Sequence, residues 1–191
     1  MTNQTTPLKI GYAVAVLMLL MILTRGHESW LASTVHLPDF TLPALIIAGV
    51  YLRRFWVAGS LIVMAVAIDN YAIVHQGVSA HCITPAYSVL IASYALLFWA
   101  AKFLTTLTID KQLFRNIMVL VGLVATQWLV ATASYYSFTT AAWAKFSSYA
   151  AHWSMIEIVP VLSWMLAVSV IFSLNQRYQV VTLFSSRKPL L

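Results

Sequence analysis

The sequence predicts an all-α integral membrane protein, because it is rich in apolar residues, poor in charge and divided into long apolar runs. Of its 191 residues, 61% are hydrophobic and 8% are charged, and its mean hydropathy is +0.85. A soluble globular domain carries roughly 25% charged residues, so this chain has too few of them to cover itself in water. We expect residues 1–191 to form a single transmembrane domain.

Six apolar runs are candidates for transmembrane helices, since a helix needs about 20 mostly apolar residues to cross ~30 Å of hydrocarbon. The run at 39–52 is the weakest candidate, because at ~1.5 Å per residue it spans only about 21 Å. Pro38 and Pro43 also lie at its start. The six predicted helices cover residues 9–24, 39–52, 55–75, 86–108, 114–138 and 150–174.

The basic residues predict the orientation, because short cytoplasmic loops keep Lys and Arg. Only Arg25 and Lys145 lie on the side opposite the termini. The other nine of the eleven lie on the side of the termini: Lys9, Arg53, Arg54, Lys102, Lys111, Arg115, Arg177, Arg187 and Lys188. We therefore expect both termini to be cytoplasmic in a multi-pass inner-membrane protein. Because the basic residues are scattered, no stripe suited to nucleic acid is expected.

The polar residues that could carry chemistry gather on the opposite, extracytoplasmic side. All five histidines fall there or within a turn of it: His27, His36, His75, His81 and His152. Glu28, Asp39 and Cys82 fall on the same side. This asymmetry predicts a polar pocket that opens outward and receives a ligand from outside the cell.

Cys82 is the only cysteine, which excludes an internal disulfide, a CxxC redox pair and a multi-cysteine zinc site. It follows His81 in the segment QGVSAHCITP, which joins the third and fourth predicted helices. A thiolate is a soft ligand that selects late or soft transition metals. The alternative is an inert, buried cysteine, but a loop position beside a histidine favours a functional role.

Asp69 lies inside the third predicted helix, roughly two turns from its outer end. A carboxylate at that depth is costly unless it faces a cavity or a partner, so Asp69 is a candidate site residue. The alternative is a structural hydrogen bond to a neighbouring helix. Tyr71 and His75 share a face of the same helix at positions i and i+4, so polar side chains rise toward the Cys82 loop.

The chain resembles the small BtuM-type vitamin B12 (cobalamin) transporters, which are relatives of the substrate-binding S components of energy-coupling factor (ECF) transporters. The resemblance covers the whole chain: six helices, cytoplasmic termini, a long first outer loop over 25–38, and a lone cysteine between helices three and four. Its specific residues are Asp69, His81, Cys82, Pro85, Tyr87 and His27.

The resemblance implies that Cys82 coordinates the cobalt of cobalamin and that Asp69, Tyr87 and His27 line the pocket. We group His81 and His75 with them as candidate cobalamin-binding residues. It also implies a transporter and not an enzyme. Because a thiolate bound to cobalt can displace the upper axial ligand, we expect removal of that ligand as an ancillary activity. The sequence contains no Walker motif or other nucleotide loop. Energy coupling would therefore come from a partner module, or the chain acts without one. Membrane lipid is the other expected partner.

Two other functions fit parts of the pattern. Cys82 could be the nucleophile of a membrane-embedded cysteine peptidase or transpeptidase, activated by a nearby histidine, although no family signature surrounds it and no Arg lies near it in sequence. Paired histidines could instead ligate a b-type haem, although most of these histidines sit at helix ends. An absorption spectrum distinguishes a corrinoid from a haem.

Overall fold

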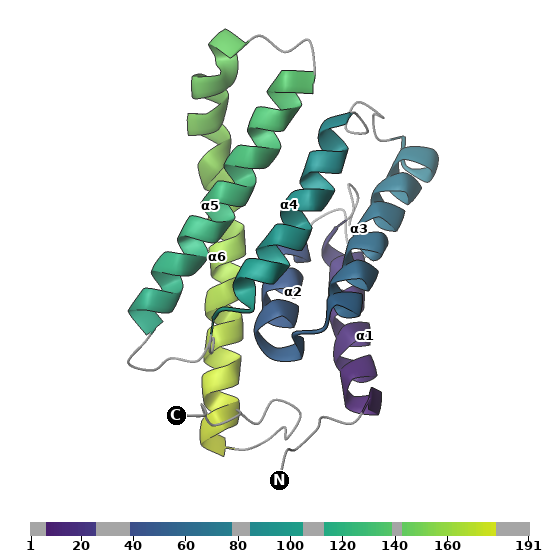
Figure 1. The fold of residues 1–191 in the computed structure, drawn as a ribbon, viewed down its shortest axis with the longest axis vertical. Coiled ribbons are helices and arrows are strands. Elements are labelled where there is room, and N and C mark those ends of the chain that lie inside the picture. The colour runs from purple at the N-terminus through teal and green to yellow at the C-terminus, as the bar shows by residue number, and fades with distance from the viewer. Residues whose placement is uncertain (1–6, 26–38, 78–84, 105–112, 139–142, 179–191) are drawn as a thin grey trace.

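The computed structural model describes residues 7–25, 39–77, 85–104, 113–138 and 143–178 (Figure 1). Within these residues every regular element is helical, which confirms the all-α prediction. The elements are α1 (Pro7–Thr24), α2 (Thr41–Ile47), the π-helix η1 (Ala48–Leu52), α3 (Phe55–His75), α4 (Pro85–Ala101), α5 (Leu113–Phe138), the 3-10 helix η3 (Trp143–Lys145) and α6 (Phe146–Tyr178).

Successive helices, the short α2 included, run alternately up and down along the bundle (Figure 1). We call the end where α1 begins and α6 ends the proximal end, and the end where α3 finishes and α4 begins the distal end. The helices begin and end at residues suited to those places. Pro85 opens α4, where its missing N–H costs nothing, and Gly77 follows α3 with a φ of 68°, which glycine adopts without strain.

The short α2 lies at the centre of the bundle, where it contacts α1, α3, α4 and α6. Leu45 and Ile46 are fully buried, as is Phe98 of α4, which belongs to the same core. A helix that is apolar on all sides is stable when its neighbours surround it. The weakest transmembrane candidate in the sequence is therefore the element around which α1, α3, α4 and α6 pack.

The helix bounds differ most from the predicted ones in three helices. The predicted helix over 39–52 is an α-helix followed by a π-helix. The predicted helix over 86–108 ends at Ala101, where the chain tightens into turns through a bond from the Lys102 N–H to the Trp99 carbonyl. The predicted helix over 150–174 is longer and runs over Phe146–Tyr178. Hydropathy locates apolar stretches, whereas backbone hydrogen bonds decide where a helix ends.

Two helical segments of the described chain are long and apolar enough to cross a membrane, Phe55–His75 and Arg115–Phe138. Only 28% and 22% of their apolar windows are buried inside the protein. The shorter apolar helical segments are Ile10–Thr24, Thr41–Leu52, Pro85–Ala101 and Ile158–Ile171.

Large apolar side chains are exposed along most of the helices. Val74 is 71% exposed and Leu166 is 60% exposed, and neither lies at a polar site. Further exposed residues of this kind are Val16, Leu19, Val63, Leu96, Leu129, Ile171 and Leu174. Soluble monomers rarely expose so many large apolar side chains, whereas lipid solvates them, so this surface is suited to a membrane.

Candidate functional site

A cluster of polar side chains connects α1, α2, α3 and α4 around Arg25. Arg25 directly follows α1, Asp39 precedes α2, and Asp69 lies in the distal part of α3. Tyr87 and Tyr94 come from α4. We call these five residues the Arg25 cluster.

Two carboxylates hold the Arg25 guanidinium. Its Nε and Nη2 donate to the two carboxylate oxygens of Asp69, each at 2.8 Å, in a bidentate pair. Its Nη1 donates to Oδ2 of Asp39, also at 2.8 Å. Bidentate Arg–carboxylate pairs are among the stronger hydrogen bonds in proteins because both partners are charged and planar.

The two tyrosines complete the cluster from α4. The Tyr87 hydroxyl donates to Oδ2 of Asp69 at 2.6 Å, a short distance that is typical of an O–H bonded to a carboxylate. The Tyr94 hydroxyl accepts a longer bond of 3.4 Å from Arg25 Nη1. The Arg25 guanidinium also lies 5.9 Å from the centre of the Tyr94 ring, within cation–π range.

The start of α2 is built into the same network. Oδ1 of Asp39 accepts bonds from the backbone N–H and the hydroxyl of Thr41, at 2.9 and 2.7 Å. This is the local turn that Asp forms with the backbone two residues on. The Phe40 N–H donates to the Thr24 hydroxyl at 3.0 Å, which joins the end of α1 to the start of α2. These contacts settle the position of Asp39 relative to Arg25.

The charges of the cluster are largely removed from solvent. The side chains of Arg25 and Asp69 are 14% and 24% exposed, and that of Asp39 is 45% exposed. Burial opposes the charge of Arg25, but Tyr94, Asp39 and Asp69 outweigh that cost and raise the pKa of the guanidinium above its ordinary value. Arg25 therefore stays charged, and with both carboxylates ionised these three groups carry one net negative charge.

The cluster is recessed from the distal end of the bundle. Figure 1 shows that α3, α4, α5 and α6 all extend beyond the end of α1, which Arg25 follows. The cluster also sits near both ends of the segment that carries Cys82, since Asp69 lies in the last turns of α3 and Tyr87 in the first turn of α4.

Two of the six predicted site residues meet in this cluster, namely Asp69 and Tyr87. His75 lies outside the cluster, exposed at the end of α3. The centroid of its ring is 4.6 Å from that of the Tyr71 ring. His27, His81 and Cys82, the predicted cobalt ligand, lie outside the described residues.

The sequence analysis did not identify Arg25 as a site residue, although a signal was present. Arg25 is one of only two basic residues on the side that is predicted to lack them, and it directly follows the first predicted helix. A carboxylate inside an apolar helix, such as Asp69, requires a partner, and a basic residue that departs from the predicted positive-inside pattern is the natural candidate. Tyr94 gave no such signal, because it resembles any other aromatic residue of an apolar helix.

The Arg25 cluster is suited to binding and orienting a ligand. Its tyrosine hydroxyls and carboxylate oxygens offer hydrogen bonds, and its net negative charge favours a cationic or amide-rich ligand over an anion. Within the described ranges, no three side chains among His, Cys, Asp and Glu lie close enough together to hold a metal ion.

Compared with models of known protein families and with curated protein sequences, the chain matches none of them.

Proposed function

We propose that this chain is a multi-pass inner-membrane transporter that takes up cobalamin or a related corrinoid. In this proposal six helices cross or enter the bilayer in an arrangement like that of an ECF S component, with both termini in the cytoplasm. The ligand enters from the extracytoplasmic side, which corresponds to the distal end of the bundle.

The observation that carries the proposal is the contact between Asp69 and Tyr87. Both were expected to line a cobalamin pocket, and the 2.6 Å hydrogen bond brings them together beside the ends of the Cys82 segment. The cluster therefore offers polar groups close to the helix ends that flank the segment carrying Cys82. The ring of cobalamin bears amide side chains, whose N–H groups are suited to carboxylate and hydroxyl acceptors.

Cys82 supplies the specific chemistry in this proposal. Its thiol loses a proton, the thiolate sulfur forms a bond to Co(III), and the bond from cobalt to its upper axial ligand breaks. The displaced ligand leaves with its electron pair, as water or as cyanide, so the oxidation state of cobalt does not change. A weakly held water is expected to exchange faster than cyanide.

The exposed apolar surface supports membrane residence. The hydrogen bonds of Arg25 concern the alternative of a cysteine peptidase, which would need a group that binds an oxyanion. An arginine that binds a developing oxyanion needs free N–H groups directed at the substrate. Arg25 instead directs its Nε and both Nη groups at Asp39, Asp69 and Thr41. Arg25 is therefore occupied by side chains of the protein itself, which supports a binding role for the cluster over an oxyanion-binding one.

The test is an absorption spectrum of the purified protein loaded with cobalamin. We expect corrin bands, with a shift that reports sulfur on cobalt. Cys82→Ser and Cys82→Ala should both lose that shift and much of the affinity, because the argument concerns the sulfur and not the packing. Removal of the upper axial ligand should stop in both variants.

Three results would contradict the proposal. Unchanged spectra and affinities in both Cys82 variants would leave Cys82 as a small buried residue. A Soret band without corrin bands would favour the haem alternative. Purified protein that neither binds nor accumulates corrinoid would remove the cobalamin assignment and leave the fold.

A further inference from the structure

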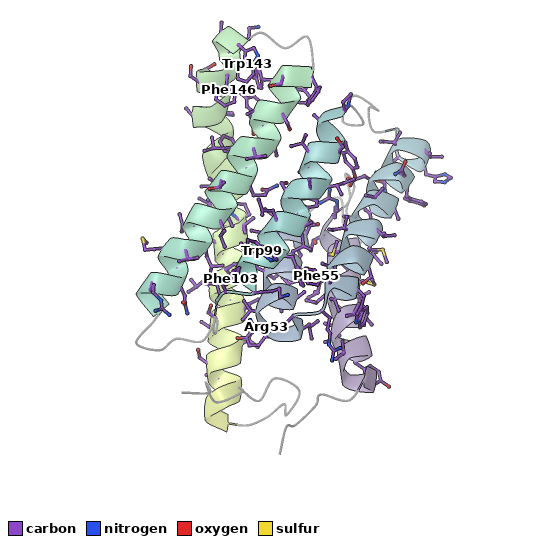
Figure 2. All side chains as sticks on the ribbon, viewed as in Figure 1. Arg53, Phe55, Trp99, Phe103, Trp143 and Phe146 are labelled. Atoms are coloured by element: carbon purple, nitrogen blue, oxygen red, sulfur yellow. The ribbon has the colours of Figure 1, made fainter. Side chains whose placement is uncertain are left out.

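Basic and aromatic side chains gather on the proximal side of the bundle, where η1 passes into α3 and where α4 ends. Arg53, Arg54 and Phe55 form the turn into α3, while Lys102 and Phe103 follow α4. We call these five residues the proximal patch. Figure 2 labels Arg53, Phe55 and Phe103 in this part of the bundle, together with Trp99.

Direct contacts join the two sides of the patch. The Lys102 ammonium lies 4.0 Å from the centre of the Phe55 ring, which links the end of α4 to the start of α3. Phe55 also packs edge-on against Phe98, with 5.8 Å between ring centroids. On α4, Trp99 and Phe103 pack edge-on at 5.0 Å. The Lys102 ammonium is therefore held beside a defined aromatic surface.

The patch is exposed and positively charged. Phe55 and Phe103 are 63% and 72% exposed, and Arg53 and Arg54 are exposed as well. The ion pairs of the described chain both belong to Arg25, so no described carboxylate neutralises Arg53, Arg54 or Lys102. The first turn of α3 contains no acidic residue, so the positive end of its helix dipole adds to the potential.

We infer that the proximal patch binds the headgroup of an anionic phospholipid. The two components of the patch match the two parts of such a lipid at the membrane surface. Guanidinium and ammonium groups bind phosphate, while exposed aromatic rings lie at the level where headgroups meet acyl chains. An acidic soluble partner would account for the charge, but it would leave exposed rings on a surface that faces hydrocarbon.

This inference rests on the membrane residence in the proposed function and is independent of the cargo. Lys145 provides a matched control. It is an exposed lysine in η3 beside Trp143 and Phe146, whose rings are 5.3 Å apart, and Figure 2 places those two rings at the distal end. It therefore offers one cation with aromatic neighbours, away from the three clustered cations of the patch.

The experiment measures lipid retention by native mass spectrometry. Delipidated protein in mild detergent is incubated with equal amounts of phosphatidylglycerol and phosphatidylcholine that have the same acyl chains. We expect the original chain and Lys145→Gln to retain phosphatidylglycerol selectively. Arg54→Gln combined with Lys102→Gln should weaken its binding by about fivefold for each cation removed, and Lys102→Arg should keep it. Unfolding midpoints without lipid establish that each variant is folded. If the double variant is not folded, Lys102→Gln alone is used to measure the loss of phosphatidylglycerol binding.

Each other outcome would overturn the inference. Equal retention of both lipids by the original chain would mean that only the apolar surface binds lipid. An equal loss in Lys145→Gln would mean that net charge alone matters. Unchanged retention in the double variant would mean that these cations do not bind the lipid headgroup, and would favour an acidic protein partner. A chain that stays in solution without detergent would instead overturn the membrane residence, which separates that failure from failure of the patch.

Discussion

At the scale of single residues, Arg25 holds the candidate site together because it satisfies two carboxylates from different elements. Removing the guanidinium would leave Asp39 and Asp69 facing one another without a cation. Removing either carboxylate would leave a largely buried cation with only one carboxylate partner. Breaking a buried ion pair by deleting one partner typically costs about 3–5 kcal/mol, because the remaining charge stays desolvated.

We therefore predict an order of destabilisation in detergent. Arg25→Gln should lower the free energy of unfolding most, Asp69→Asn next, by about 3 kcal/mol, and Asp39→Asn least. Asp39 ranks last because its side chain is 45% exposed, so water screens its charge. Thermal or denaturant unfolding of the three purified variants measures this order, and equal losses in all three would contradict the structural role of the cluster.

Asp69 has a second predicted role in ligand binding, which requires a separate measurement. If its carboxylate contacts cobalamin, the Asp69→Asn protein that remains folded should bind cobalamin more weakly than the original chain. Tyr87→Phe is the useful comparison, because it removes one hydrogen bond to Asp69 and should cost only about 1.5 kcal/mol of stability. A folded Asp69→Asn protein with normal affinity would make the carboxylate purely structural.

At the scale of elements, the close approach of η1 to α4 depends on Gly49. A Cβ added there would lie 2.7 Å from the Cβ of Ala101 and 2.7 Å from the Phe98 carbonyl oxygen. Both atoms are on or next to the backbone of α4, so neither can move without shifting the helix. The sequence at this position therefore sets how closely the central α2–η1 segment packs.

We predict that Gly49→Ala destabilises the protein by about 1–3 kcal/mol, the usual cost of overpacking a core. Gly59→Ala in α3 and Gly122→Ala in α5 are the controls, because a Cβ at either position meets nothing within 4 Å. These two changes should be neutral or stabilising by up to about 1 kcal/mol, since Ala favours a helix interior over Gly. Unfolding midpoints that place Gly49→Ala among the controls would show that η1 and α4 are not packed this closely.

At the scale of the whole molecule, the proposed orientation predicts where each end of the bundle lies. A reporter fused to the C-terminus should be active in the cytoplasm, and one inserted next to Gln76 should be active outside. The reason is the excess of Lys and Arg on the side of the termini. If the C-terminal fusion reports an outside location, the outward-facing pocket and the cytoplasmic position of the proximal patch both fail.

Composition and hydropathy were sufficient to predict an all-helical, apolar chain, because they sum over many residues and do not depend on which helices touch. They also identified Asp69, since a lone carboxylate in an apolar helix is costly wherever that helix packs. The contact of Asp69 with Tyr87 was not predicted from the residues alone, although both had been assigned to one pocket through the resemblance.

The tertiary structure decided the partner of Asp69 and the place of α2. Arg25 and Asp69 are 44 positions apart in the chain, so only the packing of α1 against α3 brings them within 2.8 Å. The run at 39–52 is short and apolar on all sides, and such a segment is compatible with a poor transmembrane span or with a buried helix. Its neighbours make it the core, because burial depends on what surrounds a segment as well as on the residues within it.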